Sequence, residues 1–85
     1  MLGLMQQQNL LISDMIEFAE KHHGDTDIVS RRVEGDIHRS NWATIAARSR
    51  QVANGLDAWK IAHGDRVATL AWNGYRHLEL YFGVS

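Results

Sequence analysis

The sequence has no cysteine and no proline among its 85 residues. Without cysteine, the chain has no disulfide framework and no thiolate ligands for a metal ion. The absence also suits a reducing compartment. The lack of proline leaves no proline-rich linker between domains, and neither internal repeats nor low-complexity segments divide the chain.

An excess of charge of one sign is also lacking, because 9 basic and 10 acidic residues are mixed along the chain and give a net charge of −1. This balance excludes a basic surface for nucleic acid and a polybasic membrane patch. The start, MLGLMQQQNLLI, has no basic region, and polar residues 6–9 interrupt it, so it is neither a secretory signal nor a transmembrane helix. We expect a soluble, cytoplasmic chain with no nucleic-acid partner and no transmembrane segment.

The chain is too short to bury a large core. A chain of this length buries only about 60–65% of the surface that its unfolded form exposes. A single core of this size rarely supplies more than roughly 3–5 kcal/mol unless a metal, disulfides or a partner helps. We therefore expect the isolated chain to be marginally stable or to self-associate.

The first predicted element is a helix in LLISDMIEFAEKHHG, after a mobile lead-in of residues 1–9. Apolar residues recur there at helical spacing: Leu11, Ile12, Met15, Ile16, Phe18 and Ala19. Ser13 or Asp14 is the expected N-cap. Gly24 is well placed to end the helix in the left-handed conformation.

A β-hairpin and a second helix are predicted next. β-Branched residues flank the turn Glu34-Gly35-Asp36, a pattern typical of a hairpin. Asn41 is the natural N-cap of the following helix, NWATIAARSRQVANGLDAW. The apolar stripe of that helix is expected to contain Ile45, Ser49, Val52, Leu56 and Trp59, widened by Trp42, Ala46 and Ala53.

The end of the chain predicts a strand, a turn and a helix. Residues 66–72, RVATLAW, are nearly continuous in apolar character, as in a strand that is buried on both faces of a parallel sheet. Apolar residues then recur at helical spacing from Tyr75 onward. This is the first half of a βαβ crossover without its second strand, so we expect the N-terminal piece of a larger α/β domain.

Few residues suggest chemistry. The five histidines have no metal-ligand spacing and are interpreted as solvated or capping residues: His22, His23, His38, His63 and His77. No glycine-rich phosphate loop and no nucleophile elbow occurs. Asn73 follows the predicted strand where open α/β sheets bind ligands, but it is more simply a helix N-cap. Trp42, Trp59 and Trp72 fit an apolar tunnel or, as we prefer, the core.

The motif GDRVATLAWNGYRHLELYFGV carries the clearest family resemblance. With the segments HHGDTDIVSRR and GDIHR…AARSRQVANGL, it resembles the N-terminal end of AMP-forming medium- and long-chain fatty-acid–CoA ligases, in the acyl-adenylate-forming superfamily. The resemblance covers residues 10–85. It implies an incomplete N-terminal piece of the large AMP-binding domain, an α/β fold with the order helix, β-hairpin, helix, inner strand, helix.

The resemblance also implies a reaction for the full-length enzymes. A fatty acid attacks ATP, accompanied by Mg²⁺, to give an acyl-adenylate, and CoA then displaces AMP. The family's phosphate loop, nucleotide motifs and lid lysine match no position here, so no catalytic, cofactor-binding or metal residue is assigned and this chain alone is expected to be inactive. The alternative is a truncated product that acts as an interaction module through its helix face and strand edge.

Overall fold

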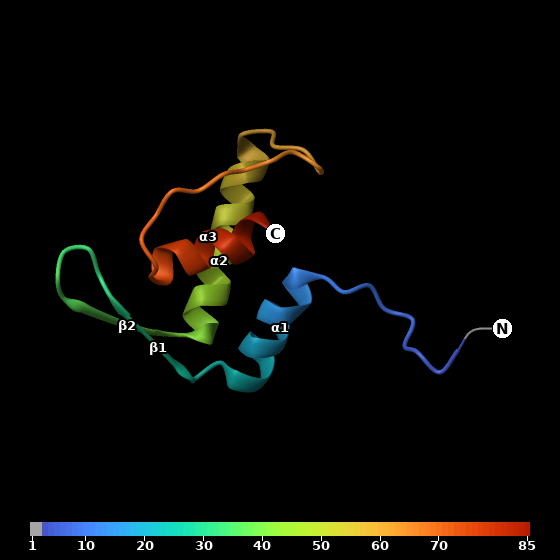
Figure 1. Ribbon diagram of the computed structural model, residues 1–85, viewed down its shortest axis with the longest axis horizontal. Coiled ribbons are helices and arrows are strands. Elements are labelled where there is room, and N and C mark those ends of the chain that lie inside the picture. Colours follow the sequence, from blue (N-terminus) through green and yellow to red (C-terminus); the bar gives the residue numbers. More distant parts are fainter. Residues whose placement is uncertain (1–2) are drawn as a thin grey trace.

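A computed structural model describes residues 3–85 of the chain. The elements follow one another in this order: helix α1 (Ile12–His23), strand β1 (Asp27–Arg31), strand β2 (Ile37–Asn41), helix α2 (Trp42–Ala58) and helix α3 (Tyr75–Val84). Helix α2 lies in the centre and contacts both other helices (Figure 1). The predicted helices and hairpin are confirmed. Residues 1–2 of the predicted lead-in lie outside the described residues, and residues 3–11 contain neither helix nor strand.

The ends of α1 differ from the prediction. The N-cap is Leu11, whose side chain makes no capping hydrogen bond. Ser13 and Asp14 lie inside the first turn, because the helix begins at Ile12, two residues before the start that a Ser13 cap would give and three before that of an Asp14 cap. Gly24 has φ −54°, a right-handed conformation, so the predicted left-handed stop is wrong. Its carbonyl oxygen instead accepts a hydrogen bond of 3.1 Å from the N–H of Ala43 in α2.

The two strands form an antiparallel hairpin that is half covered. Asp27 pairs with Asn41 at its open end, and Arg31 pairs with Ile37 beside the turn. Gly35 in the turn has φ +98°, where a side chain would be strained. Burial alternates along both strands, as the period of two requires. The covered face of the hairpin carries Ile28, Ser30, His38 and Ser40.

Helix α2 begins as predicted. The side chain of Asn41 accepts a hydrogen bond of 2.9 Å from the N–H of Thr44, which satisfies one free donor of the first turn. Ile45, Ala46 and Ser49 are the buried residues of this helix. The predicted stripe is correct in its first half but not at its end, because Trp59 is 79% exposed.

Helix α3 crosses α2 at a glycine. A Cβ atom added to Gly83 would lie 2.6 Å from Cβ of Val52 and 2.9 Å from the backbone oxygen of Ser49. The absence of a side chain at Gly83 therefore allows α3 to approach the backbone of α2. Gly55, in the interior of α2, has nothing within 4 Å of such an atom.

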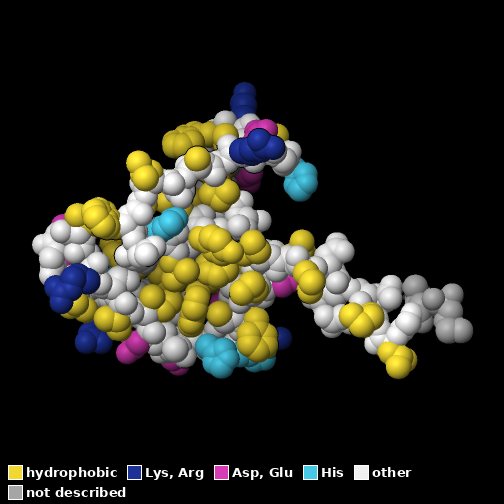
Figure 2. All heavy atoms as spheres, viewed as in Figure 1, with side chains coloured by type: hydrophobic (Ala, Val, Ile, Leu, Met, Phe, Trp, Pro, Cys, Tyr) yellow, Lys and Arg dark blue, Asp and Glu magenta, His cyan; other side chains and the backbone are white. Residues whose placement is uncertain are grey.

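The core of residues 3–85 is small. Figure 2 shows hydrophobic side chains gathered in the open across the middle of one face. The chain exposes 7158 Å², whereas a folded monomer of 9.7 kDa exposes about 5,100 Å². Its radius of gyration of 15.3 Å also exceeds the value of about 12 Å for a compact domain of this length. The buried apolar residues are Ile16, Ile45, Ala46 and Tyr75.

The predicted inner strand is not formed. Residues 66–72 run past α3 without helix, turn or ladder partner among residues 3–85 (Figure 1). Leu70 is 104% exposed and Trp72 79% exposed, although the sequence predicts burial of both. The apolar pattern indicates side chains that are stable when buried. A strand, however, forms only where a second strand pairs with its backbone hydrogen-bonding groups. Among the described residues the sheet contains only β1 and β2.

Candidate functional site

Asn73 lies in the loop before α3 and does not cap the helix. The N-cap is Gly74, which has no side chain to accept a hydrogen bond, so the predicted cap is wrong by one residue. Asn73 lines a cleft of about 210 Å³ between this loop and the hairpin turn. Residues 30–33 of the hairpin, which include Arg31 and Arg32, line the opposite side.

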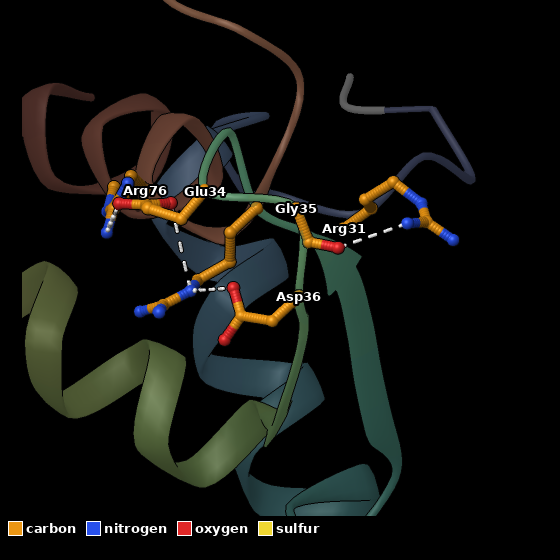
Figure 3. A network of polar contacts seen from close by, with 6 residues as sticks. Arg31, Glu34, Gly35, Asp36 and Arg76 are labelled. Carbon is orange, nitrogen blue, oxygen red and sulfur yellow. Dashed lines mark hydrogen bonds and ion pairs between the residues drawn. The ribbon is translucent and has the colours of Figure 1, made fainter.

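A network of ion pairs borders this cleft, and we call it the hairpin-tip network: Arg32, Glu34, Asp36 and Arg76. Nε of Arg32 donates to Oδ1 of Asp36 at 2.8 Å, and Nη2 of Arg76 donates to Oε1 of Glu34 at 3.0 Å. Figure 3 shows Glu34 and Arg76 meeting where the hairpin turn reaches the start of α3. The network therefore joins the hairpin to a helix more than forty residues away in the sequence.

The ion pairs shift the pKa of both carboxyl groups. The hydrogen bond from Arg32 lowers the pKa of Asp36 below its ordinary value. A backbone hydrogen bond at Glu34 itself, followed by the hydrogen bond from Arg76, lowers the pKa of Glu34. Asp36 in turn raises the pKa of Arg32, and Glu34 raises that of Arg76. All four groups are therefore charged at neutral pH and are paired with one another.

These pKa shifts predict a loss of stability in acid. A carboxyl group whose pKa is lower in the folded state stabilises that state above its ordinary pKa of about 4. The contribution is lost as the pH falls through the folded-state pKa, so the free energy of unfolding should decrease between about pH 5 and pH 2. Urea unfolding over this range is the measurement. Asp36→Asn should flatten the pH dependence, whereas Asp25→Asn, outside the network, should not; equal slopes for both variants would contradict the prediction.

Tyr75 forms the apolar side of the same junction. Its ring stacks on that of His38 with a centroid distance of 3.7 Å and an interplanar angle of 13°. The guanidinium carbon of Arg76 lies 5.2 Å from the centroid of the Tyr75 ring, within cation–π range. Nδ1 of His38 and Oγ of Ser40 are buried without a hydrogen-bond partner among residues 3–85. The contacts of Tyr75 with His38 and Arg76 hold the hairpin against α3, so we interpret this junction as structural.

The histidines do not come together. His22 and His23 are exposed and lie near the ring of Phe18. His63 is exposed in the loop after α2. Within residues 3–85, no group of three or more His, Cys, Asp or Glu side chains is arranged to hold a metal ion.

The hydroxyl of Thr69 lies 3.2 Å from Nε2 of His77, and this contact has the form of a nucleophile and a base. A working pair needs a third group to orient the imidazole and donors for an oxyanion. Among residues 3–85, no side chain or backbone group makes a hydrogen bond that would orient Nδ1, the other ring nitrogen of His77. We interpret the contact as the one that holds residues 66–72 beside α3.

The three tryptophans do not line a tunnel, and two of them are not in the core. Trp42 is half-buried and makes an edge contact with Phe82 at a centroid distance of 6.1 Å. Trp59 and Trp72 are each 79% exposed. The prediction of core packing is therefore correct for Trp42 alone. The other two lie at the margins of residues 59–74, where the described chain provides neither a strand nor a helix against which they could pack.

A buried carboxylate was missed from the sequence. Glu79 is 5% exposed, and its Oε1 accepts a hydrogen bond of 2.5 Å from Nε of Arg48 in α2. This bond raises the pKa of Arg48. The signal was present, since Glu79 lies four residues after Tyr75 and thus on the apolar stripe of α3. Its role is to join α3 to α2.

The described residues also contain no helix of the length and apolar character needed to cross a membrane. No protein-family model matches the chain. It is, however, similar over all 85 residues to the 3-methylmercaptopropionyl-CoA ligase of Ruegeria pomeroyi, with 48% identity. It is 40% identical over the same length to the medium-chain-fatty-acid–CoA ligase of Ectopseudomonas oleovorans. Over 80 residues, 94% of the chain, it is 41% identical to the long-chain-fatty-acid–CoA ligase of Thermus thermophilus.

The chain spans only 16% of the length of the first two relatives and 15% of the third. The alignments nevertheless extend over all 85 residues of the chain. The resemblance noted in the sequence is confirmed: the chain is similar over its whole length to acyl-CoA ligases and corresponds to about one sixth of the length of these relatives.

Proposed function

We propose that this chain is the N-terminal scaffold segment of a fatty-acid–CoA ligase. The enzyme would activate a fatty acid with ATP and Mg²⁺ to an acyl-adenylate and then transfer the acyl group to CoA. The observation that carries the proposal is identity of 40–48% over all 85 residues to ligases about six times as long. Residues 1–9 would be a lead-in, and residues 10–85 would be part of the large AMP-binding domain in the cytoplasm.

The exposed apolar surface supports a scaffold role. The large side chains of Leu70 and Trp72 are exposed to solvent. Burying such a side chain contributes roughly 1.5–3 kcal/mol to the stability of the folded state. A longer ligase chain would supply the strands and helices that cover them. The ion pairs described above join elements of the fold to one another, which also fits a structural role.

The names of the relatives bear on substrate choice. Those relatives act on a methylthio acid, on medium-chain fatty acids and on long-chain fatty acids, yet all three match this chain at 40–48% identity. A segment that set the acyl specificity would be expected to separate these classes. We infer that the acid is selected by other parts of the enzyme, and that this segment supports the sheet on which they are built.

A chimeric enzyme tests the proposal. The 85 residues would replace the matching segment of the Ruegeria pomeroyi ligase, and formation of AMP and acyl-CoA from 3-methylmercaptopropionate would be measured. We expect activity within about tenfold of the parent, since a change of 1.4 kcal/mol in transition-state stabilisation alters the rate tenfold. The 85-residue chain alone should show no acid-dependent ATP–pyrophosphate exchange, because it lacks donors to stabilise the transferred group.

A control chimera shows whether activity requires correct folding of the replaced segment or whether the enzyme tolerates any sequence there. A second chimera would carry Leu70→Asp, which places a carboxylate without a partner where the longer enzyme is expected to bury leucine. It should be inactive and poorly folded. A folded first chimera without activity, or exchange activity of the 85-residue chain that survives repurification, would contradict the proposal.

A further inference from the structure

We propose that Asn73–Gly74 is a site of spontaneous deamidation, at which Asn73 becomes aspartate or isoaspartate in the cleft that the hairpin-tip network borders. The chain contains two Asn-Gly pairs, Asn54–Gly55 and Asn73–Gly74, and the fold protects the first but not the second. The proposal goes beyond the ligase function and does not depend on it. It rests on the local backbone of the two pairs and not on the apolar surface that a longer chain would cover.

An asparagine that precedes glycine loses ammonia through attack by its own backbone. The backbone nitrogen of the glycine gives its proton to hydroxide and forms a bond to Cγ of the asparagine. The Cγ–Nδ2 bond then breaks, and Nδ2 leaves as ammonia after taking a proton from water. Water opens the resulting five-membered succinimide at either carbonyl carbon and gives aspartate or isoaspartate. One water is consumed and one ammonia released, without oxidation or reduction, and glycine favours the attack because it has no Cβ to obstruct its nitrogen.

The first Asn-Gly pair is held inside a helix. Asn54 and Gly55 lie within α2, where each backbone N–H donates to the carbonyl oxygen four residues earlier. The nitrogen of Gly55 can therefore attack only after this part of α2 has opened. Exposure does not make the difference, because the side chains of Asn54 and Asn73 are both exposed.

The second pair lacks this protection. Gly74 is the N-cap of α3, where the chain enters the helix from a segment without helix or strand (Figure 1). Its backbone is extended, with φ 178° and ψ −175°. Among residues 3–85, the N–H of Gly74 makes no hydrogen bond to another backbone group. A Cβ atom added to Gly74 would have nothing within 4 Å, so the surroundings also leave room for the succinimide ring.

The aspartate product would place a negative charge among arginines. Asn73 lines the cleft of about 210 Å³ together with Arg31, Arg32 and Arg76. The two carboxylates of the hairpin-tip network pair with two of these arginines. A carboxylate at position 73 would balance the charge of the third, and it would lie just before the N-terminus of α3, where the helix dipole favours negative charge. We therefore expect aspartate at this position to stabilise the contact between the hairpin and α3.

Peptide mapping by mass spectrometry on the 85-residue chain tests the proposal. The chain would be aged at mildly alkaline pH, and the deamidated fraction would be followed at residues 54 and 73. We expect conversion at Asn73 to be at least about tenfold faster, since an opening of α2 that costs about 1.4 kcal/mol lowers the reactive population at Asn54 tenfold. In concentrated guanidinium chloride the two rates should converge, because both asparagines then precede glycine in an unfolded chain.

Two alanine variants separate the effect of the glycine from that of the fold. Gly74→Ala should remove most of the product at residue 73, because the added methyl group obstructs the attacking nitrogen. The variant should fold normally, since the extended backbone at Gly74 suits any residue and the methyl group meets open space. Gly55→Ala is the matched control and should leave the rate at Asn73 unchanged. Circular dichroism should show that both variants retain their helices.

Asn73→Asp reproduces the aspartate product and measures what its charge does. This variant should shift the midpoint of urea unfolding upward at low salt, and the shift should shrink at 1 M salt, where the Debye length is only about 3 Å. Asn54→Asp is the control, because it places the same charge near the C-terminal end of α2. A negative charge there is unfavourable, so the midpoint of this variant should not rise.

Four results would overturn the proposal. Asn54 could deamidate as fast as Asn73 in the folded chain. The ratio of the two rates could stay the same in denaturant, which would assign the difference to the flanking sequence and not to the fold. Gly74→Ala could leave the rate at Asn73 unchanged, which would exclude the succinimide route. An Asn73→Asp chain no more stable at low salt than the unchanged one would contradict the effect assigned to the new charge.

Discussion

Replacing Gly83 with alanine should destabilise this chain, whereas the same change at Gly55 should stabilise it. Both glycines lie inside helices, where alanine is favoured over glycine by about 1 kcal/mol. At Gly83 the added methyl group would lie 2.6 Å from Cβ of Val52, closer than carbon atoms can pack. Helix α3 would have to move away from α2, and overpacking of this kind costs about 1–3 kcal/mol. The net loss at Gly83 should reach about 2 kcal/mol.

The backbone sets the sign of this effect. The oxygen of Ser49 is 2.9 Å from the added methyl group, and a backbone atom cannot rotate away as a side chain can. At Gly55 the same methyl group meets open space, so alanine there should add about 0.5–1 kcal/mol. Urea unfolding followed by circular dichroism measures both changes. A Gly83→Ala chain as stable as the unchanged one would show that α3 does not pack against α2 as described.

Removing Arg48 should also destabilise the chain, because it leaves the carboxylate of Glu79 buried without its cation. Loss of one partner of a fully buried ion pair costs about 3–5 kcal/mol. The side chain of Arg48 is 52% exposed, so water screens part of the interaction. For Arg48→Ala we therefore expect a smaller loss, about 1–3 kcal/mol.

A double-mutant cycle separates the pair from its surroundings. Changing Glu79 to leucine in the Arg48→Ala chain removes the isolated carboxylate and places an apolar side chain on the apolar stripe of α3. Replacement of a buried ion pair by apolar groups is often neutral or stabilising, so the double variant should be more stable than Arg48→Ala alone. Unfolding free energies of the four proteins give the coupling energy. A double variant less stable than Arg48→Ala would contradict this account.

The sequence predicted the helices and the hairpin better than it predicted which residues are buried or paired. Asn41 capped α2 as expected, because an N-cap depends on the few residues that follow it. The turn at Gly35 was likewise a local property. Residues 66–72 were predicted as a buried strand from their apolar pattern alone, but burial and pairing depend on a neighbouring strand, which residues 3–85 do not provide. Trp72 was assigned to the core for the same reason and is exposed.

The site was harder to predict than the fold. The hairpin-tip network joins Glu34 to Arg76 across 42 positions of sequence, and no local pattern indicates that the two meet. Asn73 was assigned the helix cap because asparagine is a preferred N-cap, but the helix begins one residue too late for its side chain to reach. The absence of assigned catalytic residues remains a prediction, which the chimeric enzyme would address.

The ion pairs that link one element to another differ in how strongly dissolved salt would weaken them. Glu20 and Arg50 join α1 to α2 at 2.6 Å near the surface, whereas Glu79 of the pair that joins α2 to α3 is shielded from water. At 1 M salt the Debye length falls to about 3 Å, and exposed charges are then largely screened. Raising the ionic strength would thus weaken the exposed pairs Glu20–Arg50, between α1 and α2, and Glu34–Arg76, between the hairpin and α3, more than the shielded pair between α2 and α3.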